Sequence, residues 1–463
     1  MIQQAACLWR SRRAALLLAL AVALTVQLGP SPATRASAAR HRPNVLLIVT
    51  DDQRKGTMSA LPVTRRWFKR GGVAYTNAWA PTPLCCPARA TIMTGRYAHN
   101  HEVRSNEEGQ VDNLDHQTTL QYLLRRAGYR TGIFGKFLNG WNYSLAPPHF
   151  DDYAVSWGYR YFGTPWNING TQRVVRTYAT DFLSSRVVHF LRDSEANDSR
   201  PWFAYVAARA PHSPSTPDPD YRIAPVRPWI GNPAVFEQDR TDKPPHVQAE
   251  HSSFLRAARV RKRQLRSLMS VDDLVGRVFR SLERMRERRS TLAVFLSDNG
   301  VQWAEHGIGG KGAAYTGSIK VPMYARWPGH LAPGARDTRI TTHVDIAPTI
   351  LDAAAVSPRH VLDGRSLLDS SWDRDVLFNE YWYQQRRSTR PSWASVRSSS
   401  RQYIEYYDPG ATTLEFREYY DLRADPWQLQ NLLGDDDPRN DPGVGRLAAM
   451  LDRFRSCAGP SCP

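Results

Sequence analysis

The chain has 463 residues, enough for two or three domains' worth of structure with a large hydrophobic core. Its formal net charge of +17 suits a polyanionic partner, although an arginine-rich composition explains the charge equally well. The sequence has no zinc-finger spacing, no RNA-binding aromatic signature and no basic region with heptads, so we expect no nucleic-acid partner.

The first 38 residues have the pattern of an export signal. A basic start at 10–13 precedes an apolar run from Ala14 to Leu28, and Ala36-Ser37-Ala38 provides a small-residue cleavage site. The apolar run is short for a membrane span, and no second one follows. We therefore predict a signal peptide at 1–38, a secreted, extracellular product and no stable membrane association. Both the general and the twin-arginine export routes fit the arginine pair.

The next region alternates apolar strands with helices. A continuous apolar run such as Asn44 to Thr50 is typical of a strand buried on both faces of a parallel sheet. The pattern predicts strands at 44–50, 129–134, 202–207 and 292–296, a helix at 119–127, and a long basic helix at 254–288 with room for one break. We therefore predict an α/β domain at 43–371 with a large, mostly parallel sheet sandwiched by helices.

The character of the chain changes after about residue 372. Alternating aromatic segments such as Gln402 to Tyr407 predict a small antiparallel sheet, and so a C-terminal subdomain at 372–463. Cys457 and Cys462 lie close enough in sequence to close a small disulfide loop in an oxidising compartment. Proline-rich loops at 211–229 and 241–245 are long for a compact domain, and we expect them to flank a site.

Chemically useful side chains follow several of the predicted strands. In open α/β sheets, ligands bind beyond the carboxyl ends of the strands, so residues at those ends should converge. The residues concerned are Asp51, Asp52, Lys136, His212, Asp298 and Asn299. Three carboxylates and one amide oxygen form a set of hard ligands that suits Ca²⁺ or Mg²⁺ better than zinc.

The segment from Cys85 to Arg96 is the most informative in the chain. It reads C-x-P-x-R-x-x-x-x-T-G-R, and Pro87 at the first position of a helix that stops at Gly95 explains part of the pattern. Cys85 would then sit at a helix N-terminus, where developing negative charge is favoured. The alternative is a structural cysteine beside a helix cap.

This motif resembles the signature of the type I sulfatases, which have an alkaline-phosphatase-like fold. The resemblance implies that a separate formylglycine-generating enzyme oxidises Cys85 to formylglycine. One hydroxyl of the aldehyde hydrate then attacks sulfur and expels the alcohol. The other hydroxyl then collapses to the aldehyde and releases sulfate. Other segments similar to sulfatase motifs extend the resemblance over nearly the whole mature chain: Gly128 to Leu138, Pro211 to Pro214, Gly310 to Gly312, and Glu418 to Leu432.

The resemblance also implies roles for individual residues. A single Ca²⁺ would be bound by Asp51, Asp52, the oxidised Cys85, Asp298 and Asn299. The catalytic group would comprise the oxidised Cys85, Arg89 supporting its hydrate, and Lys136, His212 and Lys311 around the sulfate and the leaving oxygen. Many arylsulfatases have a His where this chain has Leu138, and a Glu where it has Thr316. The first departure leaves His212 as the best candidate for protonating the leaving oxygen.

Further motifs favour one branch of the family. Cys85 to Pro87, His99 to His101, Gly135 to Asn139, and Arg261 to Val275 resemble N-acetylglucosamine-6-sulfatases and extracellular heparan endosulfatases. The chain lacks the long basic insertion of the endosulfatases, so we predict a sulfatase acting on glucosamine-6-sulfate glycans. The alternatives are an arylsulfatase acting on aryl sulfates, a phosphodiester or phosphonate hydrolase, and a non-catalytic binder of sulfated glycans if Cys85 is unmodified. The hydrolase alternative predicts a His in place of Asn299.

Overall fold

The computed structural model describes residues 42–463 except 197–198, 386–387, 435–436 and 438. The signal peptide predicted at 1–38 lies outside these residues. Arg42 to Pro463 forms one compact unit. None of the helices in this described part combines the length and apolarity needed to span a membrane.

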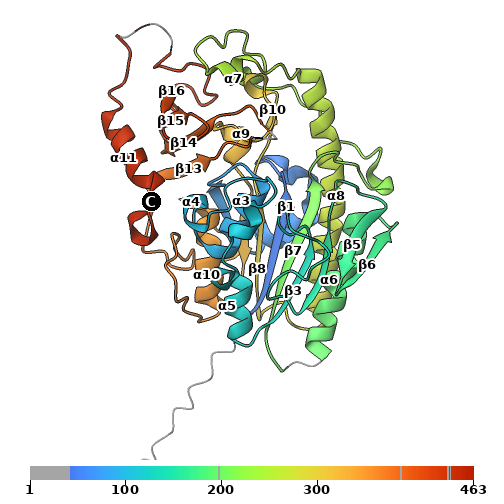
Figure 1. Cartoon of the computed structure of the whole chain (residues 1–463). Helices are drawn as coiled ribbons and strands as arrows, with labels where there is room; N and C mark the ends of the chain where they lie inside the picture. The colour runs from blue at the N-terminus through green and yellow to red at the C-terminus, as the bar shows by residue number, and fades with distance from the viewer. Residues whose placement is uncertain (1–41, 197–198, 386–387, 435–436, 438) are drawn as a thin grey trace, which may run out of the picture. The chain divides into compact units, whose positions relative to one another are not determined.

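A ten-stranded sheet forms the centre of the protein (Figure 1). Its strands are β1 (Asn44–Asp51), β2 (Val73–Trp79), β3 (Arg130–Gly135), β4 (Asp152–Ser156), β5 (Thr164–Ile168), β6 (Thr171–Val175), β7 (Trp202–Pro211), β8 (Thr291–Ser297), β11 (Met323–Arg326) and β12 (Arg336–Thr342). They are ordered β12-β2-β11-β8-β1-β7-β3-β4-β5-β6. The adjacent strands β8, β1, β7, β3 and β4 are parallel, whereas β11, β5 and β6 pair antiparallel with their neighbours.

Helices cover both faces of this sheet (Figure 1). Leu46 and Ile48 of β1 pack in a core with α6 (Ala179–Ala196) and α8 (Phe254–Arg284). Leu47 and Val49 belong to the opposite core, which contains residues of α3 (Cys85–Thr94), α5 (Leu120–Arg126) and α10 (Ile346–Ala353). Because β1 is buried on both faces, the side chains that point to either face must be apolar. The predicted parallel sheet between helices is confirmed.

Shorter elements connect these layers. They are α2 (Pro62–Thr64), α4 (Ala98–His101), α7 (Pro245–Gln248), α9 (Thr316–Ile319), and the two-stranded sheet of β9 (Gln302–Trp303) and β10 (Gly309–Gly310).

The long basic helix is continuous. α8 runs for 31 residues without a break and ends at Arg284, so both the optional break and the predicted end at 288 are wrong. The side chain of Ser253 caps its start by accepting a hydrogen bond from the Arg256 amide. Gly276 does not interrupt it, because a glycine inside a helix costs only about 1 kcal/mol and the apolar face on either side is buried.

The helix that contains the Cys85 motif starts earlier than predicted. α3 begins at Cys85 itself, so Pro87 is its third residue and not its first. The first turn of a helix leaves its amide hydrogens without intrahelical partners, and a proline there loses no hydrogen bond. Gly95 ends the helix as predicted, with a left-handed φ of 67°.

A four-stranded antiparallel sheet forms near the C-terminus, as predicted. It comprises β13 (Leu377–Tyr381), β14 (Ser392–Arg397), β15 (Arg401–Tyr407) and β16 (Leu414–Asp421), and α11 (Gly445–Arg455) packs against it. The predicted disulfide between Cys457 and Cys462 is present. The domain boundary between residues 371 and 372 stays a prediction.

Candidate active site

Two consecutive carboxylates occupy the carboxyl end of β1. Neighbouring residues on a strand point to opposite faces, so Asp51 and Asp52 would ordinarily diverge. Asp52 instead has a left-handed φ of 67°, a conformation that Asp tolerates better than most residues. Its amide donates to Asp298 Oδ1 at 3.0 Å. This turn at the end of the strand brings both buried carboxylates to one place.

Cys85 lies directly against these carboxylates. Its Sγ is 3.2 Å from Asp51 Oδ1 and 3.8 Å from Asp52 Oδ1, and Lys311 Nζ lies 2.6 Å from the same sulfur. The adjacent Cys86 points elsewhere, with its thiol 3.4 Å from the carbonyl of Asn139. Burial raises the pKa of both thiols, so both are protonated at neutral pH. Cys85 thus lies in direct contact with charged groups of the site, and as a thiol it would be a weak nucleophile.

Arg89 and Asp298 form a fully buried ion pair beside Cys85. Arg89 Nε donates to Asp298 Oδ2 at 2.9 Å, and its Nη1 donates to the Lys136 carbonyl at 3.1 Å. Burial and the charge of Asp51 raise the pKa of Asp298 to about 6, despite the guanidinium next to it. Arg89, Lys136 and Lys311 match the three carboxylates in formal charge, so burial and the nearby Asp51, and not a shortage of cations, disfavour the charged form of Asp298.

The lysines and the histidine contact the aspartates. Lys136 Nζ is 2.7 Å from Asp51 Oδ2, and Lys311 Nζ is 2.5 Å from Asp52 Oδ1. His212 Nε2 lies 3.7 Å from Asp52 Oδ2. Burial would raise the pKa of Asp51, but Lys136, His212 and Arg89 hold it well below its usual value. Without a substrate sulfate, both lysines thus neutralise carboxylates.

The structure brings together all nine residues named from the sequence: Asp51, Asp52, Cys85, Arg89, Lys136, His212, Asp298, Asn299 and Lys311. Ligand atoms of Asp51, Asp52, Cys85 and Asp298 lie within 4.8 Å of one another. Asn299 Nδ2 donates to Asp52 Oδ1 at 2.7 Å, whereas its Oδ1 is buried and has no hydrogen-bond partner in the described part of the chain. A hard divalent cation would satisfy this oxygen and the carboxylates together, so the donor set fits such an ion.

Several residues of the site were not found from the sequence. Arg390, in the C-terminal region, donates to the carbonyl of Lys311 and pairs with Glu250. Trp393 Nε1 donates to the carbonyl of Gly312 at 2.8 Å. The ring of Tyr159 stacks on His212 with 5.6 Å between centroids. These contacts join segments far apart in sequence, and no spacing or motif in the chain could have indicated them.

Comparison with known proteins identifies the family. The sequence model described as Sulfatase matches residues 43–356, and the model of the N-sulphoglucosamine sulphohydrolase C-terminal region matches 304–454. The chain belongs to the sulfatase family. It is therefore a sulfuric ester hydrolase, as the Cys85 motif predicted.

The sulfatase has similar relatives over most of its length. It is 31% identical to the human N-acetylglucosamine-6-sulfatase, across 92% of this chain and 87% of that protein. It is 25% identical to the N-acetylglucosamine-6-O-sulfatase of Bacteroides thetaiotaomicron, across 85% of this chain and 83% of that protein. The predicted resemblance to N-acetylglucosamine-6-sulfatases is confirmed.

Solved structures confirm the predicted sulfatase fold. BT4656, solved in complex with its substrate D-glucosamine-2-N,6-O-disulfate, aligns with a TM-score of 0.78 at 21% identity, covering 89% of this chain and 97% of that one. The phosphonate monoester hydrolase of Agrobacterium radiobacter aligns with a TM-score of 0.70 at 22% identity, covering 89% and 96% of the two chains. One fold thus carries both chemistries, and the residues of the site must distinguish them.

Proposed function

We propose that this sulfatase hydrolyses 6-O-sulfate esters of glucosamine-type sugars, using a formylglycine made from Cys85 and a bound Ca²⁺. The observation that carries the proposal is the position of Cys85. The first residue of the sulfatase motif has its Sγ 3.2 Å from Asp51 and 2.6 Å from Lys311 Nζ, whereas the thiol of Cys86 is directed to the Asn139 carbonyl.

The relatives support the choice of substrate. Those named N-acetylglucosamine-6-sulfatase match most of the chain, and the structurally similar BT4656 was solved with a glucosamine disulfate. An arylsulfatase of Volvox carteri is 27% identical across 93% of this chain and 77% of that protein. Aryl sulfates are therefore suitable model substrates, and the glucosamine sulfate is the proposed natural one.

The cation would be held by carboxylate oxygens of Asp51, Asp52 and Asp298, by Asn299 Oδ1 and by the oxidised side chain at position 85. When bound, it would stabilise negative charge on the sulfate oxygens and on the attacking oxygen. Hydrated formylglycine would supply that attacking oxygen. Arg89, held rigidly by Asp298, would support the residue at position 85 from one side.

The remaining residues orient the ester and transfer a proton. Lys136 and Lys311 present ammonium groups beside Cys85 and the aspartates, where a sulfate ester needs fixed positive partners. His212 Nδ1 lies 2.6 Å from the Ser213 carbonyl, and this contact keeps the proton of a neutral imidazole on Nδ1. Nε2 faces the site, so it is the atom that would give a proton to the sugar oxygen from the imidazolium form, in which both ring nitrogens carry a proton.

The rival activity on this fold is hydrolysis of phosphodiesters or phosphonates. Asn299 argues against it, because that activity predicts a histidine at this position. A binder of sulfated glycans with no activity is the other rival, and it requires Cys85 to remain a thiol. The first rival is tested by measuring, on one preparation, the turnover rates of N-acetylglucosamine-6-sulfate and of a matched phosphonate ester.

Peptide mass analysis tests the second rival, the binder of sulfated glycans with no activity. In enzyme from a host with the formylglycine-generating enzyme, Cys85 should appear as formylglycine and Cys86 as a thiol. Cys85→Ser should lose turnover. The matched control Cys86→Ser should keep it, because a serine hydroxyl can still donate to the Asn139 carbonyl. Fully active protein with an unmodified Cys85 would contradict the covalent mechanism.

Export is part of the same proposal. The pattern at 1–38 supports it. A further relative, 33% identical across 75% of this chain but only 33% of its own length, is named an extracellular sulfatase SULF-1 homolog of Drosophila melanogaster. Amino-terminal sequencing of protein recovered from the culture medium should begin after Ala38, and an intact start at Met1 would contradict the signal peptide.

A further inference from the structure

Two positive side chains lie on one buried tryptophan, away from Cys85. Lys320 Nζ and the guanidinium carbon of Arg397 are each 4.6 Å from the centroid of the Trp79 ring. Arg397, the last residue of β14, is only 7% exposed. Trp79 ends β2, so the pair lies where the large sheet meets the C-terminal one.

Neither cation has an acidic partner within the described residues. Arg397 donates to the side-chain oxygen of Gln402, and Lys320 Nζ makes no hydrogen bond there. An arginine as buried as Arg397 is normally paired with a carboxylate, whereas Lys320 is only partly buried. Burial, Arg397 and Lys55 together lower the pKa of Lys320 to about 8, and burial lowers the pKa of Arg397 to about 9. Burial thus disfavours the charged form of both side chains, and Arg397 adds electrostatic repulsion at Lys320.

These side chains open into a pocket of about 350 Å³. Besides Lys320 and Arg397, its polar lining comes from Asn77, Thr316 and the turn of Ser398 and Ser399. No Asp or Glu is among the described residues that line it. The Thr316 hydroxyl already donates to Gln428 Oε1 at 2.8 Å, so the two cations, the Asn77 amide and the serine hydroxyls are the donors that the pocket presents.

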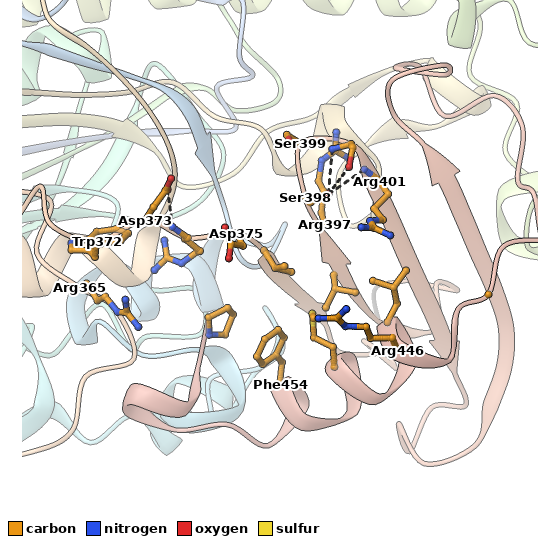
Figure 2. Close-up of a pocket in the computed structure, with 18 residues that line it drawn as sticks. Arg365, Trp372, Asp373, Asp375, Arg397, Ser398, Ser399, Arg401, Arg446 and Phe454 are labelled. Atoms are coloured by element: carbon orange, nitrogen blue, oxygen red, sulfur yellow. Dashed lines mark hydrogen bonds between the residues drawn. The ribbon is translucent and has the colours of Figure 1, made fainter.

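The turn between β14 and β15 also lines a larger cleft of about 650 Å³, shown in Figure 2. Arg397, Ser398 and Ser399 are common to both, so the pocket and the cleft meet at this turn. Arg401 and Arg446 extend the positive lining, against two aspartates on the far side of the cleft, Asp373 and Asp375. A chain longer than a single anion therefore has a path out of the pocket.

We propose that the pocket binds a tetrahedral oxyanion of the sulfate type between Lys320 and Arg397, as a site separate from the catalytic one. The anion is either free or carried on a sugar ring, and the sugar-borne form rests on the proposed function. β2 is parallel to β1 and three strands away in the sheet, so the two sites share one edge at a separation of roughly 14 Å.

The residues that line the pocket favour an anion as its ligand. A dianion would neutralise both cations and accept hydrogen bonds from the Ser398–Ser399 turn, and charge-assisted bonds of this kind are about twice as strong as neutral ones. A neutral sugar would leave the two charges without a counter-ion. A purely structural role for the Trp79 contacts would leave them without one too, and the experiment must separate that role from anion binding.

Crystals soaked in sodium selenate, whose selenium is located by anomalous scattering, test the site directly. We expect a peak between Lys320 and Arg397 in the wild type, its loss in Arg397→Gln, and its retention in the exposed control Arg289→Gln. If Arg397→Gln does not fold, Lys320→Gln replaces it, because that side chain has no hydrogen bond to lose. An empty pocket in the wild type, or equal occupancy in the glutamine variant, overturns the proposal.

Competition then separates the two sources of the anion. A sulfated glucosamine tetrasaccharide that displaces selenate from the pocket at least about tenfold better than sodium sulfate supports a sugar-borne sulfate. Displacement by sodium sulfate alone supports the free anion. Equal displacement by the chemically desulfated tetrasaccharide would refute oxyanion recognition. The Cys85→Ser variant should give the same occupancy, so failure of this site and failure of the proposed catalysis are distinguishable.

Discussion

Replacing His212 by Ala should slow turnover of a sugar sulfate far more than turnover of an aryl sulfate. A sugar hydroxyl leaves poorly without a proton, whereas an activated phenol leaves largely unaided. The His212 side chain is 15% exposed, and its Nε2 is 3.7 Å from the Asp52 carboxylate. Under the proposed mechanism, His212 would protonate a sugar leaving group and would be dispensable for an aryl one.

The size of the effect follows from the proton transfer. A positioned general acid contributes about 10²–10⁴ in rate, so kcat for the sugar sulfate should fall by roughly that factor, or about 3–5 kcal/mol in the barrier. For 4-nitrophenyl sulfate we expect a loss of less than about tenfold. The backbone around His212 should stay in place, because its amide donates to the Arg209 carbonyl and its own carbonyl accepts from Tyr161 Oη.

The assay compares kcat for the two substrates on one purified His212→Ala preparation. Added imidazole should restore part of the lost activity on the sugar sulfate and little on the aryl sulfate. His189→Ala, which removes an exposed histidine on α6, is the matched control and should change neither rate. Equal losses on both substrates without imidazole rescue would refute His212 as the acid and point to Lys136 or Lys311.

Asp51→Ala should weaken Ca²⁺ binding by more than about 100-fold and abolish turnover, because it removes one of few anionic ligands; full activity after exhaustive dialysis against a chelator would contradict the metal assignment. His99→Gln should lower the free energy of unfolding by roughly 3 kcal/mol near pH 5.5 and by less near pH 8, because it leaves the buried Glu380 unpaired. Burial lowers the pKa of His99 but Glu380 raises it above 6.5 overall, so its stabilisation is complete below pH 6.5 and is lost as the pH rises through the folded-state value. The lowered pKa of Glu380 keeps that carboxylate charged at the lower pH, and a destabilisation that instead grows from pH 5.5 to pH 8 in urea titrations would refute the pairing.

Elements with a strong local signal were predictable. The continuous apolar run of β1 indicated a strand buried on both faces, because each alternating side chain enters one of two cores. The helix stop at Gly95 was predictable because the left-handed φ there favours glycine. Boundaries were less predictable: α3 starts at Cys85 because a proline within the first turn costs no hydrogen bond.

The residues that form the candidate active site were likewise predicted from the sequence. Asp51, Asp52, Lys136, His212, Asp298 and Asn299 follow predicted parallel strands, which indicated one shared edge, and their oxygen ligands indicated a hard cation. The roles of Cys85, Arg89 and Lys311 were indicated only by the resemblance of their motifs to those of sulfatases.

The geometry that makes these residues a site was decided by the tertiary structure. Asp51 and Asp52 converge only because Asp52 takes a left-handed φ under its hydrogen bond to Asp298, 246 residues away. Arg390 reaches the Lys311 carbonyl across 79 residues, and Arg397 and Lys320 reach the same Trp79 ring only where the two sheets pack together. Contacts between segments so distant depend on how whole layers pack, and local propensity contains no information about that packing.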